Sequence, residues 1–222
     1  MIRTASEEQN AGQNHVGGFV LAGGRSSRMG RDKALLELGG LTLVVRAARI
    51  LLLCLTDPVK VVGPSQLLAP LVGELACSVI SDDYPGAGPL GGIASALIHS
   101  ERRWNLIVAC DMPYLTQDWL KYLVNRALVC SADVVLPESD YTGESRAEPL
   151  CAVYHQRASA PIRAALDRGV RKIMDGLGGL HIERVPAVDS KPFDSEGLLF
   201  QNLNTMQDYE AALGRYERMK QH

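Results

Sequence analysis

The sequence predicts an α/β protein of three layers, a Rossmann-like fold in which helices cover both faces of a mostly parallel central sheet. Short apolar runs alternate along the chain with segments of helical period, which is the pattern of β-α-β units. The 222 residues, 46% of them hydrophobic and 22% charged, are typical of a globular protein and too apolar for a disordered one. At this length a chain can bury a sizeable core without disulfides or metals.

The expected elements follow one another from Val16 onward. Short apolar runs predict strands at 16–21, 59–62, 77–80, 106–110, 134–136 and 150–154, of which 16–21 and 106–110 are expected to be buried. Amphipathic segments predict helices at 42–55, 93–99, 116–128 and 158–167, the last closed by Gly169. Thr205 and Asp208 have the spacing of a capping box, which predicts a final helix running toward Met219. The polar stretch 139–146 breaks the alternation and predicts a small antiparallel hairpin or insertion.

Composition excludes several classes of protein. A net charge of −2 disfavours a nucleic-acid binder. The longest apolar stretch, 41–55, is interrupted by Arg46 and Arg49 and is too short to span a bilayer, and no signal peptide is evident. The five cysteines are widely spaced, which favours the reducing cytoplasm over a disulfide framework or a zinc site. We therefore expect a flexible polar tail over 1–14 and one cytoplasmic domain over 15–222.

The loop after the first strand predicts a phosphate-binding site. Paired glycines, Gly23 and Gly24, let the backbone approach an anion closely. Four basic side chains against the carboxylate of Asp32 give the loop a local charge of +3; the four are Arg25, Arg28, Arg31 and Lys33. The loop lacks the spacing of a Walker A motif. A solvated surface loop is the alternative, but position, glycines and charge agree in favouring a triphosphate.

A second glycine-rich segment raises a competing hypothesis. Residues 86–91 read G-x-G-x-x-G, and Asp111 follows twenty residues later, as in a dinucleotide-binding Rossmann motif. Two details count against an oxidoreductase. Residues 81–85 separate the glycines from the preceding strand, and Pro89 removes an N–H group that the pyrophosphate would need.

Polar residues that follow the strands are candidates for the site. Asp111 follows a buried strand and is suited to Mg²⁺, which takes one or two carboxylates beside phosphate oxygens. Its alternative role, capping the next helix, is better filled by Thr116. Asp82 or Asp83 could accept hydrogen bonds from a base or ribose, or could simply be a turn acid. The histidines show no metal-ligand spacing, and no hydrolase triad is present.

Four of these segments, taken in order, resemble the molybdenum cofactor guanylyltransferase family. They are Leu21-Ala22-Gly23-Gly24 with Arg28-Met29-Gly30 and Asp32-Lys33, Asp82 with Gly88-Pro89-Leu90-Gly91-Gly92, Cys110-Asp111-Met112-Pro113, and Asn202-Leu203-Asn204-Thr205. The resemblance extends from about Val16 to Leu213.

The resemblance implies an activity and a set of substrates. The family transfers GMP from GTP to the terminal phosphate of molybdenum-molybdopterin and releases pyrophosphate. It implies Mg²⁺ as cofactor, and transient contacts with molybdoenzymes or their chaperones as further partners. No nucleic acid or membrane partner is expected.

The resemblance also implies a role for each matching residue. Leu21, Ala22 and Gly23 would line the nucleotide together with Asp82. Lys33 would contact the phosphates with Arg28, and Asp111 would hold the metal. Asn202 and Asn204 would lie on the molybdopterin side.

Three other functions remain as alternatives. A cytidylyltransferase or sugar-phosphate nucleotidyltransferase could share the scaffold, and a nucleotide-binding protein could have lost turnover. Ala22-Gly23 and the Gly88-Pro89-Leu90 turn resemble the guanylyl branch more than the cytidylyl branch. Lys33 together with Asp111 favours an enzyme, because a mere binder could dispense with the metal carboxylate.

Overall fold

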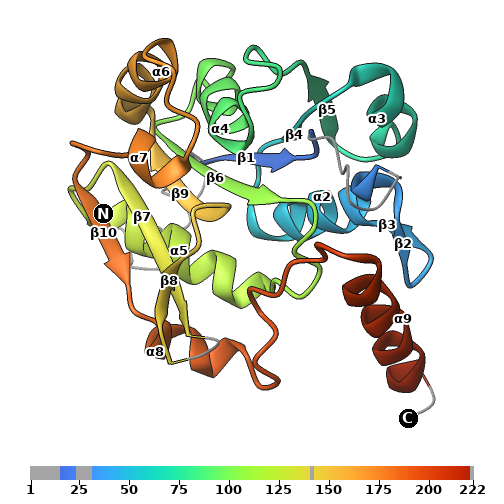
Figure 1. Ribbon diagram of the computed structural model, residues 1–222. Coiled ribbons are helices and arrows are strands. Elements are labelled where there is room, and N and C mark those ends of the chain that lie inside the picture. Colours follow the sequence, from blue (N-terminus) through green and yellow to red (C-terminus); the bar gives the residue numbers. More distant parts are fainter. Residues whose placement is uncertain (1–15, 24–31, 141–142, 221–222) are drawn as a thin grey trace, which may run out of the picture.

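The computed structural model describes residues 16–23, 32–140 and 143–220. An eight-stranded sheet in the order β10-β7-β9-β6-β1-β4-β5, with β8 paired to β7, forms its centre (Figure 1). Its strands are β1 (Val16–Leu21), β4 (Val59–Val62), β5 (Cys77–Ile80), β6 (Trp104–Ala109), β7 (Val134–Asp140), β8 (Ser145–Ala147), β9 (Cys151–His155) and β10 (Ile182–Val185). Strands β5, β4, β1 and β6 are parallel to one another, whereas β9 is antiparallel to both β6 and β7. The mostly parallel sheet of the sequence prediction is confirmed.

Helices cover both faces of the sheet. The longer ones are α2 (Leu43–Cys54), α3 (Ser65–Val72), α4 (Pro89–Ile98), α5 (Gln117–Val129), α6 (Ser159–Asp167) and α9 (Met206–Lys220). Alternate residues of β1 point to opposite faces, as in any strand. Val20 packs into the cluster beneath α2 and α5, and Phe19 packs into the cluster beneath α4 and α6. This arrangement confirms the predicted three layers.

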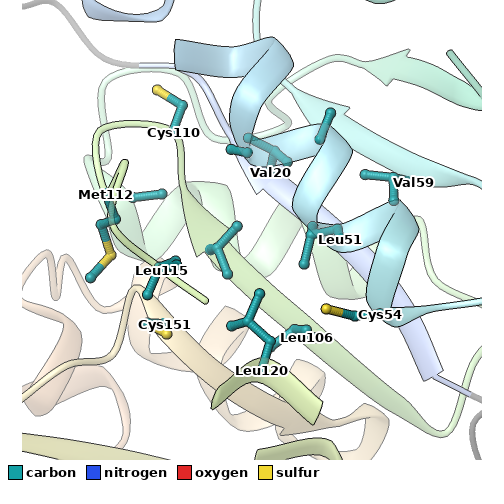
Figure 2. Close-up of a cluster of buried hydrophobic side chains, with 14 of the residues drawn as sticks. Val20, Leu51, Cys54, Val59, Leu106, Cys110, Met112, Leu115, Leu120 and Cys151 are labelled. Atoms are coloured by element: carbon teal, nitrogen blue, oxygen red, sulfur yellow. The ribbon is translucent and has the colours of Figure 1, made fainter. Parts of the chain in front are cut away.

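The core beneath α2 and α5 is formed by aliphatic side chains, cysteines and aromatic rings. Figure 2 shows Leu51, Leu106 and Leu120 meeting between the helices and the sheet. Trp119 is fully buried, and its ring lies 5.6 Å from that of Phe200, which belongs to the segment leading to α9. The core therefore ties the last part of the chain to the central sheet.

Most of the expected elements lie within two residues of their predicted positions. Helix α4 begins at Pro89, earlier than predicted, because Gly88 adopts a φ of 70° and Pro89 suits the first helical position. The predicted hairpin is the antiparallel pair β7–β8, in which Asp140 lies opposite Ser145. Helix α3, strand β10 and several shorter elements were not predicted. The shorter ones are β2 (Glu37–Leu38), β3 (Leu41–Thr42), α7 (Ile173–Gly176), α8 (Ala187–Ser190) and the 3₁₀ turns η1 (Lys33–Leu35), η2 (Gln156–Ala158) and η3 (Lys191–Phe193).

Two further sequence predictions concern the N-terminal tail and the absence of a membrane-spanning segment. The tail predicted over 1–14 lies outside the described residues, so the division into a tail and one domain stays a prediction. Among the described residues, no helix has the length and apolar character needed to cross a membrane.

Candidate active site

A cavity of about 290 Å³ opens where β1, β4 and β6 end. The chain leaves β1 toward β4 on one side and later returns to β6 on the other. Ligands of open α/β sheets bind at such a reversal, outside the carboxyl ends of the strands. The cavity is lined by Leu21, Ala22, Gly23, Asp32, Lys33, Ala34, Val62, Asp82, Gly88, Pro89, Gly92, Ala109, Cys110, Asp111, Leu150 and Asn204.

The end of β1 forms one wall of this cavity. Leu21 and Ala22 are buried, and Gly23 is exposed. Backbone hydrogen bonds fix the stretch on both sides: the Ala22 amide donates to the Val62 carbonyl (3.0 Å), and the Cys110 amide donates to the Leu21 carbonyl (3.1 Å). The three predicted nucleotide-lining residues therefore face the cavity on a rigid backbone. The predicted cations Arg25, Arg28 and Arg31 lie outside the described residues.

Lys33 brings together two distant parts of the chain. Its turn begins at Asp32, whose Oδ1 accepts a hydrogen bond from the Ala34 amide (3.0 Å). The Lys33 ammonium donates to Asp111 Oδ2 at 3.0 Å and to Asn204 Oδ1 at 2.8 Å. The side chains of Lys33 and Asp111 are each about one-fifth exposed, so this ion pair is accessible to a ligand in the cavity.

Asp111 follows β6 and is not needed to cap the next helix. Helix α5 is capped by Thr116, whose hydroxyl accepts from the Trp119 amide (3.3 Å). The Asp111 carbonyl accepts from the Leu203 amide (2.9 Å). Its backbone thus holds the C-terminal segment while its carboxylate faces the cavity.

The structure separates the two acidic residues after β5. Asp82 lines the cavity, and its Oδ1 accepts from the Tyr84 amide (3.0 Å) and the Ser95 hydroxyl (2.9 Å). Asp83 is exposed, and its Oδ2 lies 3.0 Å from Nε2 of His99. Asp82 is therefore both a turn acid and a wall residue, and Asp83 is directed elsewhere.

The glycine-rich segment forms another part of the cavity wall. Gly88 and Pro89 begin α4, and Gly92 lies in its first turn. A Cβ on Gly91 would lie 2.9 Å from the Tyr84 carbonyl oxygen. The Gly91 position is thus restricted by the packing of the turn itself, without any dinucleotide.

The two asparagines of the last motif occupy different environments. Asn204 is exposed and lines the cavity, whereas Asn202 is half-buried and lies outside the cavity wall. Leu150 also lines the cavity, because its carbonyl accepts from the Ala109 amide (2.8 Å) at the end of β6. The sequence analysis missed Leu150, and an apolar residue at the start of a strand carries no signal that could have revealed it.

Cys110 is a wall residue and not a nucleophile. Its side chain is buried, and burial raises the pKa of its thiol far above the usual range, with the Asp111 carboxylate adding to the effect. A thiolate, the reactive form, is therefore strongly disfavoured.

The carboxylates of the cavity fit a magnesium ion carried by a nucleotide, but not a metal cage. In the described part of the chain, no group of three His, Cys, Asp or Glu side chains could hold a metal. Asp32 and Asp82 already use one oxygen each within their own turns. Asp111 offers one carboxylate at a strand end, and Mg²⁺ typically takes one or two carboxylates together with water and phosphate oxygens.

Comparison with known proteins agrees with this geometry. The model of the MobA-like NTP transferase domain matches residues 18–184. The chain belongs to this family. A relative from Bacillus cytotoxicus, named a probable molybdenum cofactor guanylyltransferase, is 30% identical over 89% of this chain and 96% of its own length. A relative of the same name from Clostridium perfringens is 31% identical over 89% of this chain and 96% of its own.

Solved structures extend the comparison to the fold. The molybdopterin-guanine dinucleotide biosynthesis protein A of Archaeoglobus fulgidus is 27% identical and superimposes with a TM-score of 0.77, covering 90% of this chain and 98% of that one. A nucleotidyl transferase from Methanothermobacter, 17% identical with a TM-score of 0.71 over 93% of this chain and 99% of that one, shares the fold. As a MobA-like NTP transferase, this chain is a nucleotidyltransferase that takes a nucleotide substrate. The dinucleotide oxidoreductase hypothesis is no longer needed.

Proposed function

We propose that this MobA-like enzyme transfers GMP from GTP to the terminal phosphate of molybdenum-molybdopterin, forming the guanine dinucleotide cofactor and pyrophosphate. The observation that carries the proposal is the meeting of Lys33, Asp111 and Asn204 at one cavity. The names of the relatives from Bacillus and Clostridium support guanine as the base.

The wall residues suggest how the two substrates share the cavity. Leu21, Ala22 and Gly23 would line the guanine nucleotide, with Asp82 as an acceptor for base or ribose donors. Asp82 retains a second carboxylate oxygen beyond the one that binds Tyr84 and Ser95. Asn204, with Asn202 behind it, would lie on the molybdopterin side.

Charge neutralisation is the main task of the remaining residues. Lys33, with Arg28 from the preceding loop, would contact the phosphates, and Asp111 would hold Mg²⁺. When bound, the metal would supply positive charge to the triphosphate. The Lys33 ammonium, which pairs with Asp111 in this structure, would turn to the phosphates of the nucleotide.

The reaction itself requires little covalent chemistry from the protein. An oxygen of the acceptor's terminal phosphate bonds to the α-phosphorus of GTP. The bond from that phosphorus to the bridging oxygen of the β-phosphate breaks, and pyrophosphate leaves with the electron pair. The attacking oxygen is already anionic, so no general base is needed. The protein therefore has to supply mainly positioning and neutralisation of charge, from Lys33, from Arg28 and from the metal that Asp111 would hold.

The cellular setting follows from the same proposal. The five cysteines are free, which supports a reducing compartment such as the cytoplasm. There the product would pass to molybdoenzymes or to their chaperones through transient contacts.

A panel of nucleotides tests the proposal. Pyrophosphate release is measured with GTP, CTP, ATP and UTP, each with Mg²⁺ and molybdenum-molybdopterin, and with the acceptor omitted as control. GTP should give the fastest release, and release should depend on the acceptor. A preference for CTP would instead assign the enzyme to cytidylyl transfer, and acceptor-independent release would argue against molybdopterin.

A further inference from the structure

The segment before α9 supplies one of the two side chains that hold Lys33. The side-chain Oδ1 of Asn204 accepts a hydrogen bond from the Lys33 ammonium at 2.8 Å, and Oδ2 of Asp111 accepts a second one at 3.0 Å. An exposed asparagine side chain would ordinarily sample several rotamers. Whether Asn204 keeps its hydrogen bond to Lys33 therefore depends on what fixes the backbone of Asn204.

The residue before Asn204 is a leucine whose burial fixes the backbone at this point. Leu203 is fully buried, in one small cluster with Leu36, Leu38 and Ala212. Leu36 directly follows the turn η1 that carries Lys33. The backbones beside Lys33 and Asn204 thus share one apolar cluster, which sets their separation.

Asp208 fixes the backbone at Asn204 itself. Its Oδ2 accepts from the amides of Asn204 (2.9 Å) and Thr205 (2.7 Å). Its own amide donates to the Thr205 hydroxyl at 3.1 Å. This reciprocal arrangement is a capping box at the start of α9. Oδ2 of Asp208 therefore holds the backbone amide of Asn204, and the side chain of Asn204 contacts Lys33.

Helix α9 is tied in turn to the hairpin that follows Lys33. The Tyr209 hydroxyl donates to the Glu37 carbonyl in β2 at 2.7 Å. Figure 1 shows α9 beside the β2–β3 hairpin and apart from the central layers. Asp208 thus caps a helix that packs against the segment following the Lys33 turn.

We propose that Asp208 is a positioning residue for the transfer reaction. By holding the backbone of Asn204, it keeps the side-chain oxygen of Asn204 against the Lys33 ammonium. Lys33 is thereby directed toward the phosphates of the nucleotide. This inference rests on the proposed function, because the proposed function assigns Lys33 to the triphosphate. Within the described part of the chain, the Asp208 carboxylate makes its hydrogen bonds with Asn204 and Thr205, and the charge of Lys33 also helps to lower its pKa.

A double-mutant cycle tests the inference. Steady-state pyrophosphate release and the dissociation constant for GTP are measured for Asp208→Asn, Asn204→Ala and the double variant, with Glu210→Gln, an exposed acid on the same helix, as matched control. Loss of the charged cap should lower kcat/KM about fivefold. Asp208→Glu should restore activity to within about twofold of the wild type, since Glu also serves in a capping box. Glu210→Gln should leave activity unchanged.

The double variant decides between a positioning role and a merely structural one. If Asp208 acts through Asn204, the double variant should be no slower than Asn204→Ala alone, because the two losses share one cause. A further fivefold loss on top of Asn204→Ala would overturn the inference. So would an Asp208→Asn variant with a lower melting temperature and unchanged kcat/KM.

The cycle also separates failure of this inference from failure of the proposed function. If the wild type binds GTP but releases no pyrophosphate, the proposed transfer is wrong, and the cycle is read from the GTP dissociation constants instead. There, non-additive losses would support the positioning role and additive losses would contradict it. If the wild type binds no nucleotide, both are overturned.

Discussion

Lys33 and Asn204 are 171 residues apart in the chain, yet the Lys33 ammonium donates to the Asn204 side chain at 2.8 Å. Asp111, from the middle of the chain, completes the arrangement at 3.0 Å. Three strictly separate segments therefore have to fold together before the site exists. The ammonium is held by two oxygens before any ligand arrives, so a nucleotide meets an ordered cation.

The first prediction concerns the carboxylate of Asp111. Asp111→Asn keeps the shape of the side chain but removes its charge, and pyrophosphate release should fall by roughly a hundredfold or more, as for loss of other transition-state charge stabilisers. The melting temperature should change little, because the side chain lies at the cavity surface. Asp167→Asn, an exposed acid at the end of α6, is the matched control. Retention of Mg²⁺-dependent turnover by Asp111→Asn would show that another residue holds the metal.

Asp82 and its neighbour Asp83 provide a comparison within one turn. Asp82 lines the cavity and Asp83 faces His99. Asp82→Asn should raise the dissociation constant for GTP about ten- to a hundredfold, as expected for loss of a hydrogen bond to a charged group. Asp83→Asn should change it by less than about twofold. Calorimetric titration measures both, and equal effects would contradict the role given to Asp82.

Two adjacent glycines test whether α9 must dock on the hairpin. Gly39 and Gly40 both have positive φ, 69° and 78°, so alanine strains each backbone similarly. A Cβ on Gly39 would lie 2.1 Å from the Tyr216 ring, whereas a Cβ on Gly40 meets nothing within 4 Å. Gly39→Ala should therefore be less stable than Gly40→Ala by about 1–3 kcal/mol, the usual cost of overpacking. Urea unfolding measures the difference, and equal stabilities would show that displacing the Tyr216 ring costs little free energy.

The stability contributed by Asp208 should depend on pH. Burial acts to raise the pKa of its carboxyl, but hydrogen bonds from Thr205 and Asn204 prevail and lower it. Because the folded pKa lies below the unfolded value of about 3.9, the stabilisation is complete above that value and is lost as the pH falls through the folded pKa. The difference in free energy of unfolding between wild type and Asp208→Asn should be constant near neutral pH and shrink below about pH 4. If the difference in free energy of unfolding is the same near neutral pH and in acid, the stabilisation comes from another group.

Local sequence signals predicted the central part of the fold correctly. The strand Val16–Leu21 is buried along its whole length, and its sequence is a continuous apolar run. In Val59–Val62 the half-buried Lys60 is the one interruption of the apolar run. Helix α3 was missed because it is short and contains Pro70, which normally interrupts a helix. The burial of Leu68 and Val72 against the core nevertheless stabilises this helix.

The candidate site was predictable only in part. The strand-end rule predicted Asp111 and Asp82 at the cavity, the basic loop after the first strand indicated Lys33, and the resemblance added Asn204. No local signal indicated that Lys33 would pair with Asn204, because that contact depends on the docking of α9 against the β2–β3 hairpin. Long-range contacts of this kind follow from packing, which periodicity and spacing do not report.

The fate of labelled phosphorus tests the central claim most directly. GTP labelled at the α-phosphorus is incubated with the enzyme, Mg²⁺ and molybdenum-molybdopterin, and the products are separated by chromatography; a parallel reaction uses GTP labelled at the γ-phosphorus. The α-label should appear in a guanine dinucleotide of the acceptor and the γ-label in pyrophosphate. Transfer of the γ-label to the acceptor, or retention of both labels in GTP, would contradict guanylyl transfer.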